Sequence, residues 1–358
     1  MNERQQLFED AVALLRELIS IPSFSKEEHG TAGAISKFLA LRSVEHSWVQ
    51  NNIYALNKYF DPSKPTLLLN SHHDTVKPNK GYTLDPFTPI EKEGKLYGLG
   101  SNDAGGALVS LIACFLHFYD KEGLAYNIVL AATAEEEISG PNGIEHTLKF
   151  IPKPDCAIVG EPTLLNMAVA ERGLMVLDCV AKGRSGHAAR NEGDNAINKA
   201  VKDIEWFNSY SFPKVSGLLG PVKMTVTVIE TENKAHNVVP DSCRFVTDIR
   251  VNENYSFEEV LETIRQHISS DFTPRSLRMR SSMIEPTHPL VVAGTKLGRS
   301  MYGSPTTSDK ALIPCPSLKL GPGDSARSHT ADEFIFIDEI RQGIDLYINI
   351  TGELVEPK

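Results

Sequence analysis

The sequence has few cysteines, no long apolar run and no cluster of basic residues, and each absence argues against a class of protein. Its cysteines are Cys114, Cys156, Cys179, Cys243 and Cys315. They are odd in number, lie far apart and form no C-x-x-C pair, which argues against a thiolate zinc site. Cys114 falls within an apolar run, where a buried and inert thiol is expected. The cytoplasm is the default compartment for such a chain.

Membranes and nucleic acids are also disfavoured as partners. No apolar run approaches the roughly 20 residues that a bilayer span requires, so we expect a soluble protein without a membrane partner. Residues 1–20 carry apolar side chains at helical spacing, which indicates an amphipathic helix and not a signal peptide. The 36 Lys and Arg against 46 Asp and Glu give a net charge of −10, which argues against phosphate binding.

What the sequence does contain is an alternation of strand-like and helix-like segments over 358 residues, a length typical of two domains. Strand-like runs at 66–70, 127–133 and 156–160 alternate with helix-like stretches such as 104–119. This alternation predicts an α/β fold with a mixed, mostly parallel sheet flanked by helices.

The pattern of predicted strands and helices changes in the middle of the chain. Long β segments at 174–182, 222–230 and 243–251 are accompanied by helical stretches near 194–209 and 256–270. We expect these segments to form a small α+β sandwich at 173–287, inserted into the main domain. The main domain would then be discontinuous, with a first part at 1–172 and a second at 288–358.

Acidic and histidine residues fall at the ends of the predicted strands. They are His72 and Asp74 after the first strand, Glu135, Glu136 and Glu137 after the second, Glu161 after the third, and Asp103 and His329 in two glycine-rich loops. Ligands of open α/β sheets bind beyond the carboxyl ends of the strands, so these groups can converge on one crevice. Packing such like charges together is costly unless a cation lies between them. Imidazoles and carboxylates without thiolates suit Zn²⁺, with Co²⁺ or Mn²⁺ as substitutes.

Each of these features has an ordinary structural explanation when it is taken alone. A single His after a strand is usually not a ligand, and three consecutive Glu residues usually form a solvated run. In the segment SHHD, however, extended backbone places residues i and i+2 on one face, so His72 and Asp74 would act together. His73 would then point away and serve packing or the surface. The joint pattern favours a metal site.

Five segments of the chain, in order, resemble the M20 metallopeptidase family. They are SHHDTV, GLGSNDAGG, TAEEEISG, GEPT and GPGDSARSH. The family includes acetylornithine deacetylase, succinyl-diaminopimelate desuccinylase and carboxypeptidase-like members, and the resemblance covers nearly the whole chain. It implies a zinc-exopeptidase-like catalytic domain with two Zn²⁺ per subunit. The insert at 173–287 would be a lid and dimerisation domain.

The resemblance also implies a role for each metal-site residue. His72 would bind the first metal, Asp103 would bridge both metals, and Glu161 would complete the first set. Glu137 and His329 would hold the second metal.

The same resemblance implies that Glu136 is the general base and that Asp74 orients His72. Water held between two cations about 3.5–4 Å apart loses its proton near neutral pH. Glu136 would take that proton and hand it to the leaving amine. The family's acidic run commonly begins with Asp, whereas Glu135 stands there in this chain, a departure that leaves the positions of base and ligand intact.

Three residues of the insert match family positions. By resemblance, His187 assists at the oxyanion, from its own or a partner subunit, while Asn237 and Arg250 contact substrate. Arg250 could grip a carboxylate through its planar guanidinium group. Alternatively, it could pair with Asp248 or Asp241 on the sheet.

The segment SPTTSDKAL resembles the family's substrate-side T-S-D-A loop, which makes Ser308 and Lys310 candidate substrate contacts. Lys310 stands where a small residue is common. An exposed surface charge is the favoured interpretation of Lys310. The alternative is that it favours a substrate with an extra carboxylate, such as an N-succinyl group.

We therefore predict a zinc-dependent amidohydrolase of linear amides that acts on a small N-acyl amino acid. N-acetyl-L-ornithine, hydrolysed to ornithine and acetate in arginine biosynthesis, is the first expectation. A desuccinylase of diaminopimelate, or of acylated ornithine or citrulline, and a di- or aminopeptidase stay open as alternatives. A non-catalytic binding protein would lack Glu136 or a metal ligand, and none is missing. We expect a homodimer formed through the insert.

Overall fold

The computed structural model describes residues 3–190 and 192–357. By their internal contacts these residues form unit 1 (1–169, 284–302 and 308–358) and unit 2 (170–283 and 303–307). The expected insert was 173–287, so unit 2 begins and ends a few residues earlier and also includes 303–307. Two contacts explain this addition. Thr307 Oγ1 donates a hydrogen bond to the Arg172 carbonyl, and the backbone of Gly303 lies against that of Leu218.

Unit 1 contains a mixed sheet whose four central strands are parallel. Its strands follow the order β1 (His46–Val49), β2 (Asn52–Leu56), β6 (Asn127–Thr133), β3 (Thr66–His72), β7 (Cys156–Gly160), β17 (Ser317–Leu320) and β8 (Met167–Glu171). Strands β6, β3, β7 and β17 pair in parallel, whereas β1, β2 and β8 pair antiparallel to their neighbours. This arrangement confirms the predicted α/β fold.

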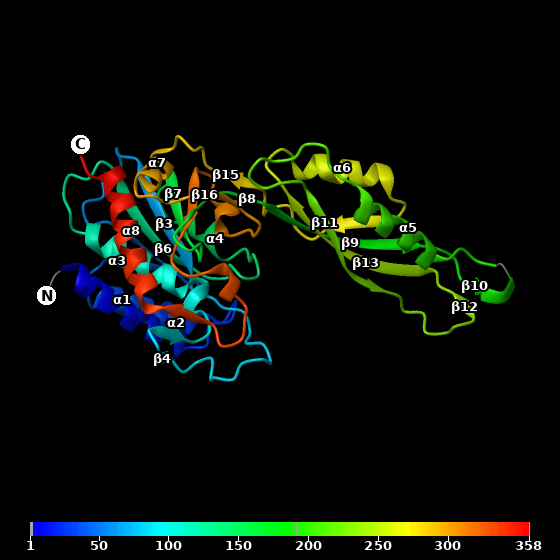
Figure 1. The fold of residues 1–358 in the computed structure, drawn as a ribbon, viewed down its shortest axis with the longest axis horizontal. Helices are drawn as coiled ribbons and strands as arrows, with labels where there is room; N and C mark the ends of the chain where they lie inside the picture. The colour runs from blue at the N-terminus through cyan, green and yellow to red at the C-terminus, as the bar shows by residue number, and fades with distance from the viewer. Residues whose placement is uncertain (1–2, 191, 358) are drawn as a thin grey trace. The chain divides into compact units, whose positions relative to one another are not determined.

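Both faces of this sheet are covered, because the parallel strands are apolar on both sides. In β3, Leu67 and Leu69 belong to a large core that also includes side chains of α1 (Glu3–Ile19), α2 (His29–Ala40), α3 (Gly106–Phe118) and α8 (Ile337–Val355). Leu68 points to the opposite face, where it packs with Ile144 of the short helix α4 (Ile144–Thr147). Figure 1 shows α1, α3 and α8 side by side against strands β3 and β6.

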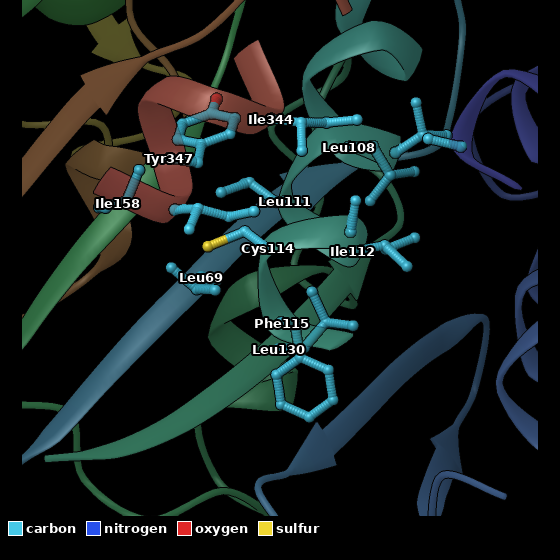
Figure 2. Packing of buried hydrophobic residues seen from close by; sticks show 14 of the residues in the cluster. Leu69, Leu108, Leu111, Ile112, Cys114, Phe115, Leu130, Ile158, Ile344 and Tyr347 are labelled. Carbon is cyan, nitrogen blue, oxygen red and sulfur yellow. The ribbon is translucent and has the colours of Figure 1, made fainter. Parts of the chain in front are cut away.

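Helix α3 lies at the centre of the larger core. Figure 2 shows Leu111, Cys114 and Phe115 of α3 gathered with Leu69 of β3 and Tyr347 of α8. Burial raises the pKa of the Cys114 thiol to about 12, so the prediction of a buried and inert thiol is confirmed.

Unit 2 is an antiparallel sheet with helices on one face. The strand order is β11 (Lys223–Glu230), β13 (Ser242–Val251), β9 (Gly173–Lys182) and β14 (Asp271–Pro274). Alternate residues of β9, from Met175 to Ala181, enter a core with α5 (Ala196–Ser209) and α6 (Phe257–His267). The expected α+β sandwich is confirmed, and a short antiparallel pair of strands, β10 (Gly186–His187) and β12 (Val238–Val239), extends it (Figure 1).

The remaining elements are short. They are β4 (Ile90–Lys92), β5 (Lys95–Tyr97), β15 (Ser282–Met283), α7 (Pro289–Lys296), β16 (Met301–Ser304), β18 (Phe334–Phe336) and single helical turns at Ser101–Gly105, Ala188–Arg190, Asp309–Leu312 and Ser325–Arg327. Strands β18, β5 and β4 form a small antiparallel sheet. Among the described residues, no helix is long and apolar enough to cross a membrane.

Candidate metal centre

The predicted metal-site residues of unit 1 come together at the carboxyl ends of its parallel strands. His72 is the last residue of β3, Glu136 and Glu137 follow β6, and Glu161 directly follows β7. Asp103 lies in the loop before α3, and His329 lies in the loop after β17, beyond the turn at Ser325–Arg327. Parallel strands end at the same edge of the sheet, which is why groups from distant parts of the sequence meet there.

Two histidines face opposite ends of one carboxylate. His72 Nε2 lies 3.5 Å from Asp103 Oδ1, and His329 Nε2 lies 3.7 Å from Asp103 Oδ2. Glu137 completes the second group, because its two oxygens lie 3.0 and 3.2 Å from His329 Nε2. Asp103 is therefore shared between two sets of potential ligands, as the resemblance implied for a bridging residue.

The first group contains two further carboxylates at nearly equal distances. Glu161 Oε1 lies 3.8 Å and Glu136 Oε2 lies 3.9 Å from His72 Nε2. Potential ligand atoms of His72, Glu136 and Glu161 lie within 4.8 Å of one another, as do those of His72, Asp103 and Glu137. Distance alone does not separate a ligand from a general base here.

The electrostatics of the cluster fit a bound cation. Burial, together with the charges of Glu161 and Asp309, raises the pKa of the Glu136 carboxyl well above its ordinary value, despite the opposing effect of His72. Burial by itself lowers the pKa of His72, but the surrounding carboxylates raise it well above its ordinary value. The hydrogen bond to Glu137 raises the pKa of His329 to about 9. Positive charge among these groups would relieve the repulsion, and their donor set is one that divalent zinc accepts.

Asp74 forms hydrogen bonds to several members of the cluster. His72 Nδ1 lies 3.1 Å from the Asp74 carbonyl and 3.4 Å from its carboxylate, so Nε2 is the nitrogen that faces the cluster. The carboxylate of Asp74 accepts hydrogen bonds from the backbone N–H groups of Glu136 (3.0 Å) and Glu137 (3.2 Å) and from the Ser25 hydroxyl (2.7 Å). Asp74 therefore positions both His72 and the acidic loop.

Glu135 has a different environment from the two glutamates that follow it. Its backbone is in the left-handed region, with φ of 57°, and its carboxylate accepts a hydrogen bond from Asn142 Nδ2 at 2.9 Å. Its N–H donates to the buried carboxylate of Glu28 at 3.2 Å. Glu135 thus closes the loop that carries Glu136 and Glu137. Sequence reasoning missed Glu28, which lies more than 100 positions away.

His73 faces away from the cluster, as predicted. Its ring nitrogens are hydrogen-bonded to the Thr31 hydroxyl and the Asn51 carbonyl, both at 2.9 Å. Burial lowers the pKa of His73 to about 4, so the ring is neutral.

Asp309 is a buried acid near the site that sequence reasoning also missed. Its carboxylate accepts a hydrogen bond from Thr133 Oγ1, at the end of β6, at 2.9 Å. Burial raises the pKa of Asp309 to about 7. The available indication in the sequence was its place in the segment SPTTSDKAL, where only Ser308 and Lys310 were singled out.

The expectation that Lys310 is an exposed surface charge is wrong. Lys310 is 1% exposed, and Ser308 beside it is also buried. The Ser308 hydroxyl accepts a hydrogen bond from the Lys310 N–H at 3.4 Å, which caps the turn Asp309–Leu312. The turn packs against β17 and α4, and this packing removes Lys310 from solvent.

The candidate residues of unit 2 lie in two separate places. His187 is an exposed residue of β10, and the Asn237 carbonyl accepts a hydrogen bond from the next residue, Ala188, at 3.0 Å. Arg250, near the end of β13, donates two hydrogen bonds to Asp248, at 2.8 and 3.0 Å. One of the two partners considered for Arg250 is therefore observed, whereas the substrate roles of all three residues stay predictions.

An α/β sheet with His, Asp and Glu side chains gathered at its strand ends is typical of metal-dependent hydrolases. Residues 68–352 match peptidase family M20/M25/M40, and the chain belongs to this family of hydrolases. The resemblance inferred from the five segments is confirmed.

Proteins similar to this chain are named for different activities. The chain is 23% identical to succinyl-diaminopimelate desuccinylase of Acidiphilium cryptum, over 94% of this chain and 96% of that protein. It is 29% identical to acetylornithine deacetylase of Proteus mirabilis, over 81% and 79%. The fold is similar to that of an M20 metallo-carboxypeptidase from Sulfolobus solfataricus, with a TM-score of 0.76, 18% identity and coverage of 96% and 98%.

Proposed function

We propose that the protein is a metal-dependent amidohydrolase that removes an N-succinyl group from a small amino acid. The observation that carries the hydrolase is the position of Asp103, whose two oxygens lie 3.5 and 3.7 Å from the Nε2 atoms of His72 and His329. A carboxylate placed between two imidazoles suits a pair of divalent cations, for which zinc is the first choice and cobalt or manganese are substitutes.

Five residues would hold the two cations. His72, Asp103 and Glu161 would hold one, and Asp103, Glu137 and His329 would hold the other. When bound, such cations polarise an amide carbonyl and lower the pKa of water. Asp74 would keep His72 in the tautomer that presents Nε2.

Glu136 is proposed to move the proton. Its carboxyl group is largely buried, and its raised pKa suits a group that must hold a proton for part of the reaction. The Glu136 carboxylate would accept a proton from water and release it to the amide nitrogen as that nitrogen leaves. Hydrogen bonds from the backbone of Glu136 and Glu137 to Asp74 fix the loop from which Glu136 acts.

The succinyl group is favoured over the acetyl group that was the first expectation. Relatives named succinyl-diaminopimelate desuccinylase match over almost the whole length of both chains. Lys310 is a buried cation on the turn whose Asp309 contacts the end of β6, close to the segment that carries Glu136. We propose that the ammonium group of Lys310 recognises the second carboxylate of the acyl group. The 29% identity to acetylornithine deacetylase keeps an N-acetyl amino acid as the second candidate substrate.

We propose that the protein is a homodimer, and the spacing of residues in unit 2 supports this proposal. Arg250 pairs with Leu174 at the beginning of β9, whereas His187 follows the end of β9 at Lys182. Eight residues of extended strand separate these ends, about 26 Å. One small substrate cannot touch both residues of one chain, so we propose that His187 and Asn237 serve the site of a partner subunit. A cytoplasmic location remains our expectation.

The test compares matched acyl groups on one amino acid. We expect kcat/KM to be higher for N-succinyl-L-ornithine than for N-acetyl-L-ornithine, with N-succinyl-diaminopimelate and simple dipeptides as further substrates. In Lys310→Met, loss of a charge-assisted hydrogen bond should lower kcat/KM about 10- to 100-fold for the succinyl substrate alone.

The control is Lys319→Met, which removes a buried lysine of the neighbouring strand β17. It should leave the ratio of succinyl to acetyl activity unchanged. Equal losses on both acyl groups in Lys310→Met would eliminate Lys310 as the residue that recognises succinate.

A further inference from the structure

Glu333 lies four residues after His329 and reaches into the loop that carries Asp103. Its Oε1 accepts hydrogen bonds from the backbone N–H groups of Asn102 and Asp103, both at 2.9 Å. Its Oε2 accepts a third, from the Gly100 N–H, at 3.1 Å. Glu333 is 2% exposed, so these three donors would lose a partner in the interior if the carboxylate were removed.

The backbone of the two loops is joined at further points. The Glu333 carbonyl accepts a hydrogen bond from the Gly98 N–H at 3.0 Å. The Asn102 side chain accepts from the Asp324 N–H at 3.0 Å and donates to the Asp324 carbonyl at 3.1 Å. The segment that supplies His329 and the loop that supplies Asp103 are therefore held together on both sides of His329.

We propose that Glu333 is a positioning residue that sets the spacing of Asp103 and His329 and thereby the affinity for the second cation. This inference rests on the metal centre proposed above. Within the described part of the chain, the donors that meet the Glu333 carboxylate are backbone N–H groups of residues 100–103, so we assign Glu333 no direct contact with cation or substrate. Groups that orient metal ligands typically change metal affinity 10- to 100-fold when they are altered.

Asp332 provides a matched control in the neighbouring position. Its carboxylate also accepts three hydrogen bonds from a loop, from the Thr83 N–H (2.8 Å), the Thr83 hydroxyl (2.5 Å) and the Leu84 N–H (2.9 Å). That loop carries none of the candidate ligands. Loss of Asp332 therefore loosens a comparable loop without moving Asp103.

The experiment compares Glu333→Gln with Asp332→Asn, two isosteric changes in adjacent residues. Zinc would be titrated into each metal-free protein in competition with a chromogenic chelator. Glu333→Gln should weaken the more loosely held zinc about 10- to 100-fold and alter the visible spectrum of the cobalt-loaded protein. Asp332→Asn should bind zinc as the unchanged protein does, with a similar decrease in the melting temperature of the metal-free form.

A third variant covers the case in which Glu333→Gln does not fold. Glu333→Asp keeps a carboxyl group but is one methylene shorter, so it should retain part of the zinc affinity. Unchanged affinity and cobalt spectrum in the Glu333 variants would overturn the positioning role while leaving the proposed function standing. An equal loss in Asp332→Asn would also overturn it, because general loosening would then be sufficient. If the unchanged protein bound no divalent cation, both proposals would fail.

Discussion

Several acidic side chains differ between the two units of the chain in their exposure to solvent and in the direction of their pKa shifts. In unit 1, acidic groups are buried together, and burial raises the pKa of Asp309 to about 7 and that of Glu333 to about 8. In unit 2, acidic groups such as Glu258 and Asp178 lie on the surface beside arginines. The hydrogen bonds from Arg280 lower the pKa of Glu258 to about 2, and those from Arg275 lower the pKa of Asp178.

We infer from this difference that the buried charges of unit 1 are there to bind a cation, whereas the exposed charges of unit 2 only pair with one another in water. Buried like charges oppose folding unless a cation lies among them, so we expect bound metal to offset the cost of the buried acids of unit 1. Exposed ion pairs such as Arg280–Glu258, at 2.6 Å, contribute little to stability because water already screens them. We therefore expect the stability of unit 1 to depend on bound metal and the stability of unit 2 to be independent of it.

Removal of metal should have the largest effect. Treatment with a chelator should abolish hydrolysis and lower the melting temperature, because ligand that binds only the folded state adds about 4 kcal/mol at a thousandfold excess over Kd. Added zinc or cobalt should restore both. Elemental analysis would verify that the treated protein is free of metal. Full activity in that protein would contradict the expected dependence of unit 1 on metal.

Loss of Glu136 should come next. Glu136→Gln should reduce kcat by about 10²- to 10⁴-fold while two cations stay bound, because a general base is lost and the ligands are not. The matched control is Glu135→Gln, which alters the neighbouring carboxylate that closes the loop. It should affect stability more than turnover. Survival of activity in Glu136→Gln would show that another group moves the proton.

Asp309 tests the cost of buried charge. Its folded pKa of about 7 lies above its unfolded value near 3.9, so the metal-free protein loses stability as pH rises between these values. Asp309→Asn keeps an acceptor for Thr133 and removes the charge. The metal-free variant should be more stable than the unchanged protein at pH 8, by up to about 4 kcal/mol, and equally stable near pH 4. Urea unfolding at both pH values measures this, and a less stable variant at pH 8 would contradict it.

The smallest effect is expected in unit 2. Arg280→Ala should return the pKa of Glu258 from about 2 to its ordinary range near 4.3, because the two hydrogen bonds from the guanidinium are lost. NMR titration of the Glu258 carboxyl measures the change. Zinc affinity and melting temperature at neutral pH should be unaltered. A large loss of stability would show that charges of unit 2 are not mere surface pairs.

Sequence reasoning succeeded where a local pattern carries the information. The apolar runs at 127–133 and 156–160 coincide with β6 and β7, because fully buried parallel strands are apolar on both faces. The two-residue period of extended backbone separated the directions of His72 and His73. The opposite directions of these rings follow from that period alone.

It failed where the deciding contacts join distant segments. Lys310 was expected to be an exposed surface charge, and the packing of its turn against β17 and α4 buries it. The hydrogen bonds from the Glu135 N–H to Glu28 and from the Asp103 N–H to Glu333 span over 100 residues, so no local period reveals them.

By itself, the sequence determined the order of strands and helices and the groups that follow each strand, since both depend on short-range spacing. The family could be inferred from five short segments for the same reason. Tertiary structure alone decided which carboxylates are buried together, that Glu333 holds the backbone of Asp103, and that Arg250 lies beside the beginning of β9, whose other end precedes His187. These features depend on contacts between segments far apart in the chain, which form only when the sheet is assembled.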